Sequence, residues 1–184
     1  MLLQRSFLSL AALGILAAGA AWAQDDDAAE RRAELDANAQ ETLQNLFSNV
    51  EGSQALYDDA AGYAVFAATK AGFGISGGGG AGVVVDKGAG TTVYMRMGTA
   101  GIGFSFGAQK YDIVMLFQSA ELLKSFVDGG WDSGAAAEAM AGNDAVGAGV
   151  GFIDGAAVFT LTETGAMASA SVSGTRFWVA EELN

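Results

Sequence analysis

Apolar residues recur with a helical period in the first third of the sequence and with a strand period after it. From about residue 25 to Val50 they fall three and four positions apart, which places them on one side of a helix. These positions are Leu35, Ala39, Leu43, Leu46, Phe47 and Val50. The pattern predicts an amphipathic helix from Asp25 to about Val50 that packs on a sheet. A membrane-surface helix is the alternative, but the polar side here is acidic rather than basic.

Two shorter helices are predicted from capping signals. Ser53 is placed to cap a helix that includes Leu56 and Tyr57 and ends near Gly62. Ser119 is placed to cap another, which contains Leu122, Leu123, Phe126 and Val127 and stops at Gly129-Gly130.

Strand-like segments follow one another at short intervals, which favours antiparallel neighbours. They are Tyr63–Ala68, one or two strands from Gly72 to Val85, then Thr91–Met97, Gly101–Ala108, Asp112–Phe117, Ala156–Thr162, Ala166–Ser173 and Arg176–Val179. The prediction is a single α+β domain: a curved, antiparallel, glycine-rich sheet covered by the N-terminal amphipathic helix and short helices. Its helical part spans residues 25–61 and its sheet-rich core residues 62–184.

Glycines alternate with larger residues in three places within this sheet. The runs are Gly72, Gly74 and Gly78 with Ser76; Gly101, Gly103 and Gly107 with Ser105; and Gly147, Gly149 and Gly151. Because side chains alternate between the faces of a strand, each run gives one bare face. Glycine inside a strand costs about 0.5–1 kcal/mol relative to alanine. We therefore expect either a close neighbour against these faces or a sharp bend in the sheet.

The first residues of the sequence are typical of an export signal. Arg5 precedes an apolar run from Phe7 to Ala21, and Ala21-Trp22-Ala23 fits a small-x-small cleavage site. A membrane anchor is the alternative, but the apolar run is shorter than the ~20 residues that span a bilayer. The sequence predicts a signal peptide over residues 1–23, a mature N-terminus at Gln24, and a periplasmic or secreted protein.

Charge and missing residue types exclude several functions. The formal net charge is −12, and removal of the leader with Arg5 leaves −13. Nucleic acid and long-range attraction to anionic bilayers are disfavoured by this charge. Two Gly-x-Ser-x-Gly matches, around Ser76 and Ser105, lack the histidine that such a serine needs, because the sequence contains no histidine. It also contains no cysteine, so we expect no enzyme, no metal and no cofactor.

Several motifs resemble the SYLF-domain family over roughly Leu43 to the C-terminus. They are Lys70-Ala71-Gly72-Phe73, the run from Gly98 to Gln109, the run from Asp112 to Phe117, Gly147-Ala148-Gly149 and Gly174-Thr175. The resemblance implies a lipid-binding module over residues 24–184. It also implies phosphoinositide binding and actin regulation for eukaryotic members, and export for bacterial ones. An exported protein would not meet actin, so actin is not an expected partner here.

The expected function is therefore that of an exported, non-catalytic module that binds phospholipid or a membrane surface mainly by apolar contact. Candidate lipid contacts are Lys70, Phe73, Arg96, Phe104, Phe106 and Lys110. The basic residues among them can equally be ordinary surface charges. The alternative function is a structural or interaction protein of the cell envelope, in which Leu43, Leu46 and Phe47 fill the groove instead of a lipid.

Overall fold

The structure is a computed structural model that describes residues 11–73, 75–102, 107–129, 151–152, 154–162, 165–167 and 175–184. The elements in chain order are α1 (Ala11–Asn49), α2 (Ser53–Asp59), β1 (Gly62–Phe73), β2 (Ile75–Asp86), β3 (Thr91–Ile102), β4 (Gly107–Phe117), α3 (Ala120–Gly129), β5 (Ala156–Thr162), β6 (Gly165–Met167), β7 (Thr175–Val179) and a 3-10 turn at Glu181–Leu183.

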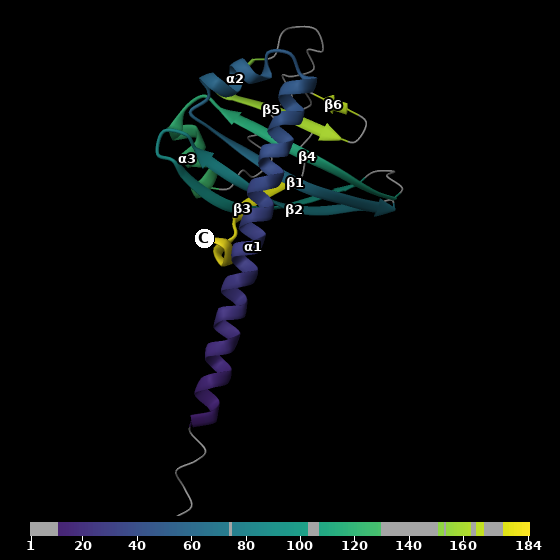
Figure 1. Cartoon of the computed structure of the whole chain (residues 1–184). Coiled ribbons are helices and arrows are strands. Elements are labelled where there is room, and N and C mark those ends of the chain that lie inside the picture. Colours follow the sequence, from purple (N-terminus) through teal and green to yellow (C-terminus); the bar gives the residue numbers. More distant parts are fainter. Residues whose placement is uncertain are drawn as a thin grey trace, which may run out of the picture.

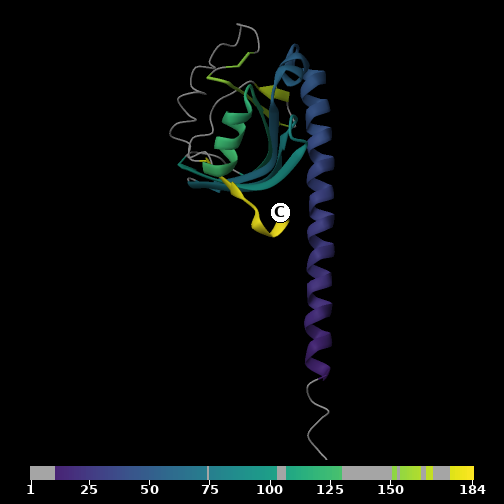
Figure 2. The same ribbon diagram turned by 90° about the vertical axis from the view of Figure 1, so that its left-hand side faces the viewer.

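The strands form one antiparallel sheet in the order β6-β5-β4-β1-β2-β3-β7. The sheet curves around α3, and the C-terminal half of α1 crosses its other face (Figures 1 and 2). The N-terminal half of α1 extends away from the sheet (Figure 1). This arrangement confirms the predicted α+β fold with a curved antiparallel sheet.

Helix α1 carries the predicted apolar stripe. Its Ala39, Leu43 and Leu46 are buried against Val65 of β1 and strands β2, β4 and β5, and its remaining predicted positions are partly buried there. The helix begins earlier than predicted, since it runs through residues 11–24 without a break.

The prediction that Ser53 caps α2 through its side chain was wrong. Gly52, with φ +82°, precedes α2 and makes no side-chain cap bond. The Ser53 hydroxyl instead donates to the Val50 carbonyl at 2.7 Å and lies 3.3 Å from the Leu46 carbonyl. Ser53 therefore fastens the end of α1, whose last carbonyls have no partners within the helix.

The C-terminal end of α2 is held by Lys87, which follows β2. Its ammonium donates to the carbonyl oxygens of Tyr57, Asp58 and Ala60 at 2.6, 3.2 and 3.0 Å. A cation at this end of a helix complements its dipole. Lys87 is therefore a helix cap, where the sequence indicated only a charged turn.

Helix α3 fills the concave face of the sheet and starts as predicted, with the Ser119 hydroxyl accepting from the Leu122 amide at 3.2 Å. Phe126 of α3 is fully buried, and its ring lies 5.2 Å from that of Phe117 and 5.3 Å from that of Phe177. Phe66 packs on Phe177 at 4.8 Å. These rings are the centre of the core between α3 and the sheet.

Neither of the first two glycine runs belongs to a single strand. Phe73 pairs with Ile75, so the run from Gly72 to Gly78 passes around the tip of the β1–β2 hairpin. The run from Gly101 to Ala108 starts in β3 and finishes in β4, which lie on opposite sides of that hairpin, and its residues 103–106 lie outside the described residues. Residues 147–150 of the third run and residues 168–174 of the predicted strand Ala166–Ser173 lie outside the described residues.

A close neighbour does lie against the bare face of β2, and it is the backbone of β1. An ideal Cβ on Gly82 would overlap the Val65 carbonyl oxygen and stand 2.7 Å from Cδ1 of Phe66. A Cβ on Gly80 would overlap the Ala67 carbonyl, and one on Gly78 would stand 3.0 Å from Cα of Lys70. Glycine at these three positions lets the sheet coil tightly around α3.

Candidate functional site

The face of the sheet toward α1 changes character along the strands. Val65, Val83 and Val114 pack under Leu43 and Leu46 of α1. Positions two, four and six residues nearer the hairpin tip lie on the same face, because side chains alternate. Most of those positions carry small residues, and the exceptions are Arg96 in β3 and Lys110 and Asp112 in β4. The small residues are Ala67, Thr69 and Ala71 in β1, Gly77, Gly79 and Ala81 in β2, Gly98 and Ala100 in β3, and Ala108 in β4. We call these nine residues the small-residue floor.

The small-residue floor is partly or fully accessible at every position, and Gly79, Thr69 and Ala100 are among its exposed members. Its pairing is regular. Lys110, Thr69, Gly79, Gly98 and Arg176 stand side by side on five adjacent strands. Neighbouring strands lie about 4.8 Å apart, so this row spans roughly 19 Å between its two basic ends. The floor is a broad surface of nearly bare backbone bordered by cations.

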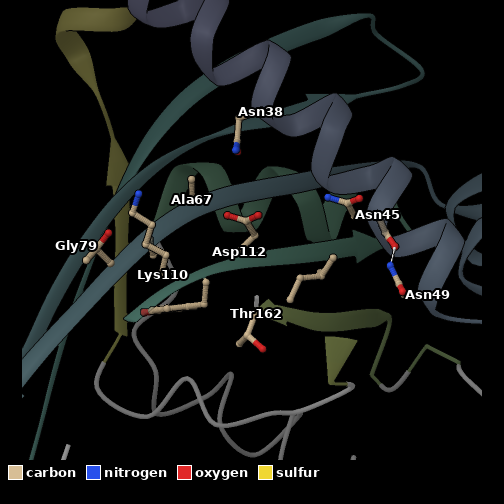
Figure 3. Close-up of a pocket in the computed structure, with 12 residues that line it drawn as sticks. Asn38, Asn45, Asn49, Ala67, Gly79, Lys110, Asp112 and Thr162 are labelled. Atoms are coloured by element: carbon tan, nitrogen blue, oxygen red, sulfur yellow. Dashed lines mark hydrogen bonds between the residues drawn. The ribbon is translucent and has the colours of Figure 1, made fainter. Parts of the chain in front are cut away.

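A hollow of about 640 Å³ lies between this floor and α1. Its wall is formed by Asn38, Asn45 and Asn49 of α1, and its base by residues of β1, β2, β4 and β5 (Figure 3). The base residues are Ala67, Ala68, Thr69, Gly79, Lys110, Tyr111, Asp112, Leu161 and Thr162. We call this space the α1 hollow. It has an amide-rich wall and a floor of small residues.

Asp112 is the partly buried carboxylate of the α1 hollow. One of its oxygens, Oδ2, accepts a hydrogen bond of 3.0 Å from the hydroxyl of Thr42, a buried residue of α1. Burial raises the pKa of Asp112 above its ordinary value, the Thr42 hydrogen bond lowers it, and the nearby Glu41 carboxylate raises it further. The site therefore retains a carboxylate in surroundings that disfavour its charge.

The three basic residues predicted to meet a head group are separated in the structure. Lys110 is exposed and lines the α1 hollow. Lys70 pairs with Gln109 and Gly78, so it lies on the opposite face, toward α3. Arg96 lies on the α1 face, and its Nε donates to Glu182 at 2.6 Å in an exposed ion pair. Only Lys110 of the three therefore belongs to the hollow.

Of the three phenylalanines predicted to contact lipid, one borders a gap in the described residues and two lie outside them. Phe73 ends β1 at the hairpin tip, where its backbone pairs with Ile75. Phe104 and Phe106 lie in the segment 103–106, outside the described residues. Trp178 of β7 is an apolar residue that the sequence did not single out. It is 46% exposed, and its ring edge would stand 3.2 Å from a Cβ on Gly98 of the floor.

Sequence reasoning also missed the hollow's polar lining. Asn38, Asn45 and Asn49 are seven and four residues apart, and this spacing places them along one side of a helix. Asp112 could have been noticed in the same way, because it is a polar residue on the same face of β4 as the buried Val114 and Leu116. The sequence did contain a signal for this site: a row of asparagines beside the apolar stripe of α1, and one carboxylate on an otherwise apolar face of β4.

Other candidate chemistry finds no support in the described part of the chain. Ser76 lies inside β2, paired with Gly72 and Gly101, rather than on a strand-to-helix turn. No group of three or more potential metal ligands occurs among the described residues. In the same ranges, no helix has the length and hydropathy needed to cross a membrane.

The comparison with known proteins agrees with the motifs. Residues 98–184 match the Ysc84 family, described as "Las17-binding protein actin regulator". The chain is 28% identical over 156 residues to Beta cell expansion factor A of Aeromonas veronii. That similarity covers 85% of this chain and 60% of the relative, so the chain spans less than two thirds of the relative's length. The matched region includes β4, with Lys110 and Asp112. The match to the Ysc84 (SYLF) family over residues 98–184 therefore agrees with the resemblance indicated by the motifs.

Proposed function

We propose that this protein is an exported, non-catalytic module that binds phospholipid, mainly by apolar contact, with the head group in the α1 hollow and the acyl chains on the small-residue floor. The observation that carries the proposal is an accessible floor of glycine and alanine beside a polar hollow. Small residues let a ligand approach the backbone closely. The match of residues 98–184 to the Ysc84 family supports a role in lipid binding or actin regulation, and the predicted export signal favours the first.

Charge and surface chemistry support apolar contact as the main source of affinity. With a net charge of −13 after export, the protein gains no long-range attraction to anionic bilayers. Burial of apolar area contributes about 25 cal/mol per Å², so a few hundred Å² of acyl chain yields several kcal/mol before ordering costs. One basic residue near a membrane adds about 1 kcal/mol. Trp178 extends the apolar surface at the edge of the floor.

A second candidate function is a structural protein of the cell envelope without a lipid ligand. It is favoured by the packing of Leu43 and Leu46, which fill the valine-rich half of the α1 face. The other half is not filled in this way, because the α1 hollow remains above Thr69 and Gly79. This difference between the two halves is why we place lipid binding first.

Native mass spectrometry of the exported protein, purified from its own cells without denaturant, tests the proposal. We expect phospholipid to be retained, and a protein free of lipid would count against it. A matched pair of variants locates the site. Gly79→Val adds a side chain inside the hollow, whereas Gly88→Val adds one in the turn after β2, away from both the hollow and the small-residue floor. Both positions have room for a Cβ, with the nearest atom at 3.4 Å in each case. Gly79→Val should reduce the retained lipid, and Gly88→Val should not.

A further inference from the structure

Asp112 is a carboxylate with no cationic partner among the described residues. Its described partner is the neutral Thr42 hydroxyl, and the ion pairs of the described residues, Arg96 with Glu182 and Lys124 with Asp128, do not involve it. Partial burial without a positive partner is costly for a charged group. If this position served only the fold, an apolar or amide side chain would be sufficient there. The carboxylate is therefore the feature of the α1 hollow that folding does not explain.

Lys110 stands two residues from Asp112 on the same strand and the same face (Figure 3). Alternate residues of a strand are about 6.6–6.8 Å apart. The α1 hollow thus presents one positive and one negative side chain from β4, whose Cα atoms have this spacing. Around them stand neutral hydrogen-bonding groups, which include Asn38, Asn45 and Thr69.

The surrounding charge strengthens the preference for a cation at Asp112. Glu41 of α1 acts on Asp112 electrostatically and has the same sign. A ligand that carried only a phosphate would meet Lys110 favourably and Asp112 unfavourably. A ligand with a phosphate and an ammonium would satisfy both, and a primary ammonium supplies three hydrogen-bond donors.

We infer that the α1 hollow selects a zwitterionic phosphoethanolamine head group, with the phosphate on Lys110 and the primary ammonium on Asp112. The inference rests on the proposed lipid-binding function and adds its head-group class. A choline head group carries the same charges but cannot donate hydrogen bonds from its nitrogen. A glycerol head group has no cation at all. Phosphatidylethanolamine therefore binds in preference to phosphatidylcholine and to phosphatidylglycerol.

The test is flotation of the exported protein with phosphatidylcholine vesicles that contain added phosphatidylethanolamine or phosphatidylglycerol. The wild type should bind the ethanolamine vesicles best. Asp112→Asn should weaken that binding about tenfold, the scale of a charged hydrogen bond, and leave binding to pure phosphatidylcholine unchanged. Glu41→Gln is the matched control, since it removes the same charge from an exposed neighbour and should retain the preference.

A soluble head group separates recognition of the ligand from recognition of a membrane. Glycerophosphoethanolamine should release the wild type from ethanolamine vesicles, whereas glycerophosphoglycerol should not. Equal binding of Asp112→Asn and wild type to ethanolamine vesicles, or failure of glycerophosphoethanolamine to compete, overturns the inference. Equal binding to all three vesicles overturns it as well but leaves lipid binding in place. Absence of binding to every vesicle overturns the proposed function itself.

Discussion

The ammonium of Lys87 lies over the ring of Tyr57, 4.6 Å from its centroid, while it also donates to the Tyr57 carbonyl. One side chain thus closes α2 and anchors it to the turn after β2. Cation–π contact and helix-end charge each contribute about 0.5–1 kcal/mol.

Replacement of Lys87 by methionine should lower the free energy of unfolding by about 1–2 kcal/mol, because the three carbonyl acceptors at the end of α2 lose their donor. Urea unfolding followed by circular dichroism measures the change. Lys124→Met is the control, since Lys124 forms only an exposed pair with Asp128 and should cost under about 0.5 kcal/mol. Equal losses in the two variants would contradict the role of Lys87 as a cap.

Because β1 approaches β2 closely, replacing glycine by alanine should have opposite effects on stability at the two faces of β2. Gly82→Ala should destabilise the protein by about 1–3 kcal/mol, because its Cβ would overlap the Val65 carbonyl and the backbone would have to move. Gly79→Ala should be neutral or stabilising by up to about 1 kcal/mol, since its Cβ has ordinary room. Thermal and urea unfolding of both variants check this. A Gly82→Ala protein as stable as Gly79→Ala would show that the coil of the sheet does not require glycine.

Asp112 should make the protein less stable as pH rises. Burial raises its pKa in the folded state, so the folded state binds the proton more tightly than the unfolded state does. Below the ordinary value of 3.8 the residue is protonated in both states, and the cost of its charge is absent. That cost grows as pH passes through the raised folded value.

Asp112→Asn should therefore be more stable than the wild type at pH 7, and the difference should disappear as pH falls below about 3.8. The amide keeps an acceptor for the Thr42 hydroxyl. Stability measured by urea unfolding at several pH values gives the curve. A variant that is less stable at pH 7 would mean that the carboxylate supports the fold.

Lipid binding should depend little on salt. Apolar contact and a zwitterionic head group both give weak ionic-strength dependence, whereas attraction through net charge would be screened. Flotation at low and high salt checks this. Phe73→Ala should weaken binding more than Lys70→Ala, because Lys70 points to the face opposite the α1 hollow. Strong salt dependence with Lys70→Ala as the weaker binder would contradict the apolar mechanism.

Export predicts a mature protein that begins at Gln24. Helix α1 passes through Ala23 and Gln24 without interruption, so the helix has to open locally for a peptidase to cut there. N-terminal sequencing of protein recovered outside the cytoplasm determines the start. A chain that begins at Met1 would favour retention of the leader.

Local patterns in the sequence predicted the helices and strands β5 and β7 well. The stripe through Ala39, Leu43 and Leu46 and the Ser119 cap each depend on nearby residues, and both are present. The glycine runs were misread because alternation is the same on one strand and across a hairpin tip. The sequence does not reveal which glycine meets a neighbouring backbone, so Gly82 could not be distinguished from Gly79.

The candidate site was predicted less well, because it depends on contacts between distant segments. Lys110 was identified, but Asp112 on the same face of β4 and the wall residue Asn38 were not. Asn38 comes near these two residues only because α1 crosses β4, which the sequence does not specify. Lys70 and Lys110 looked equivalent along the chain, yet the register places them on opposite faces.

The position of the β1–β2 hairpin between β3 and β4 has a consequence for folding. Strands β1, β2 and β3 pair with their neighbours in sequence, and such contacts form early because they close short loops. Strand β4 must cross from β3 to the other side of the β1–β2 hairpin to join β1, where Phe117 pairs with Gly62. The α1 hollow combines α1 with β4, so it is completed only after this late step. A ligand in the hollow would therefore slow unfolding, because it would hold α1 and β4 together, which are the contacts that form last. It would leave the early pairing of β1, β2 and β3 unaffected.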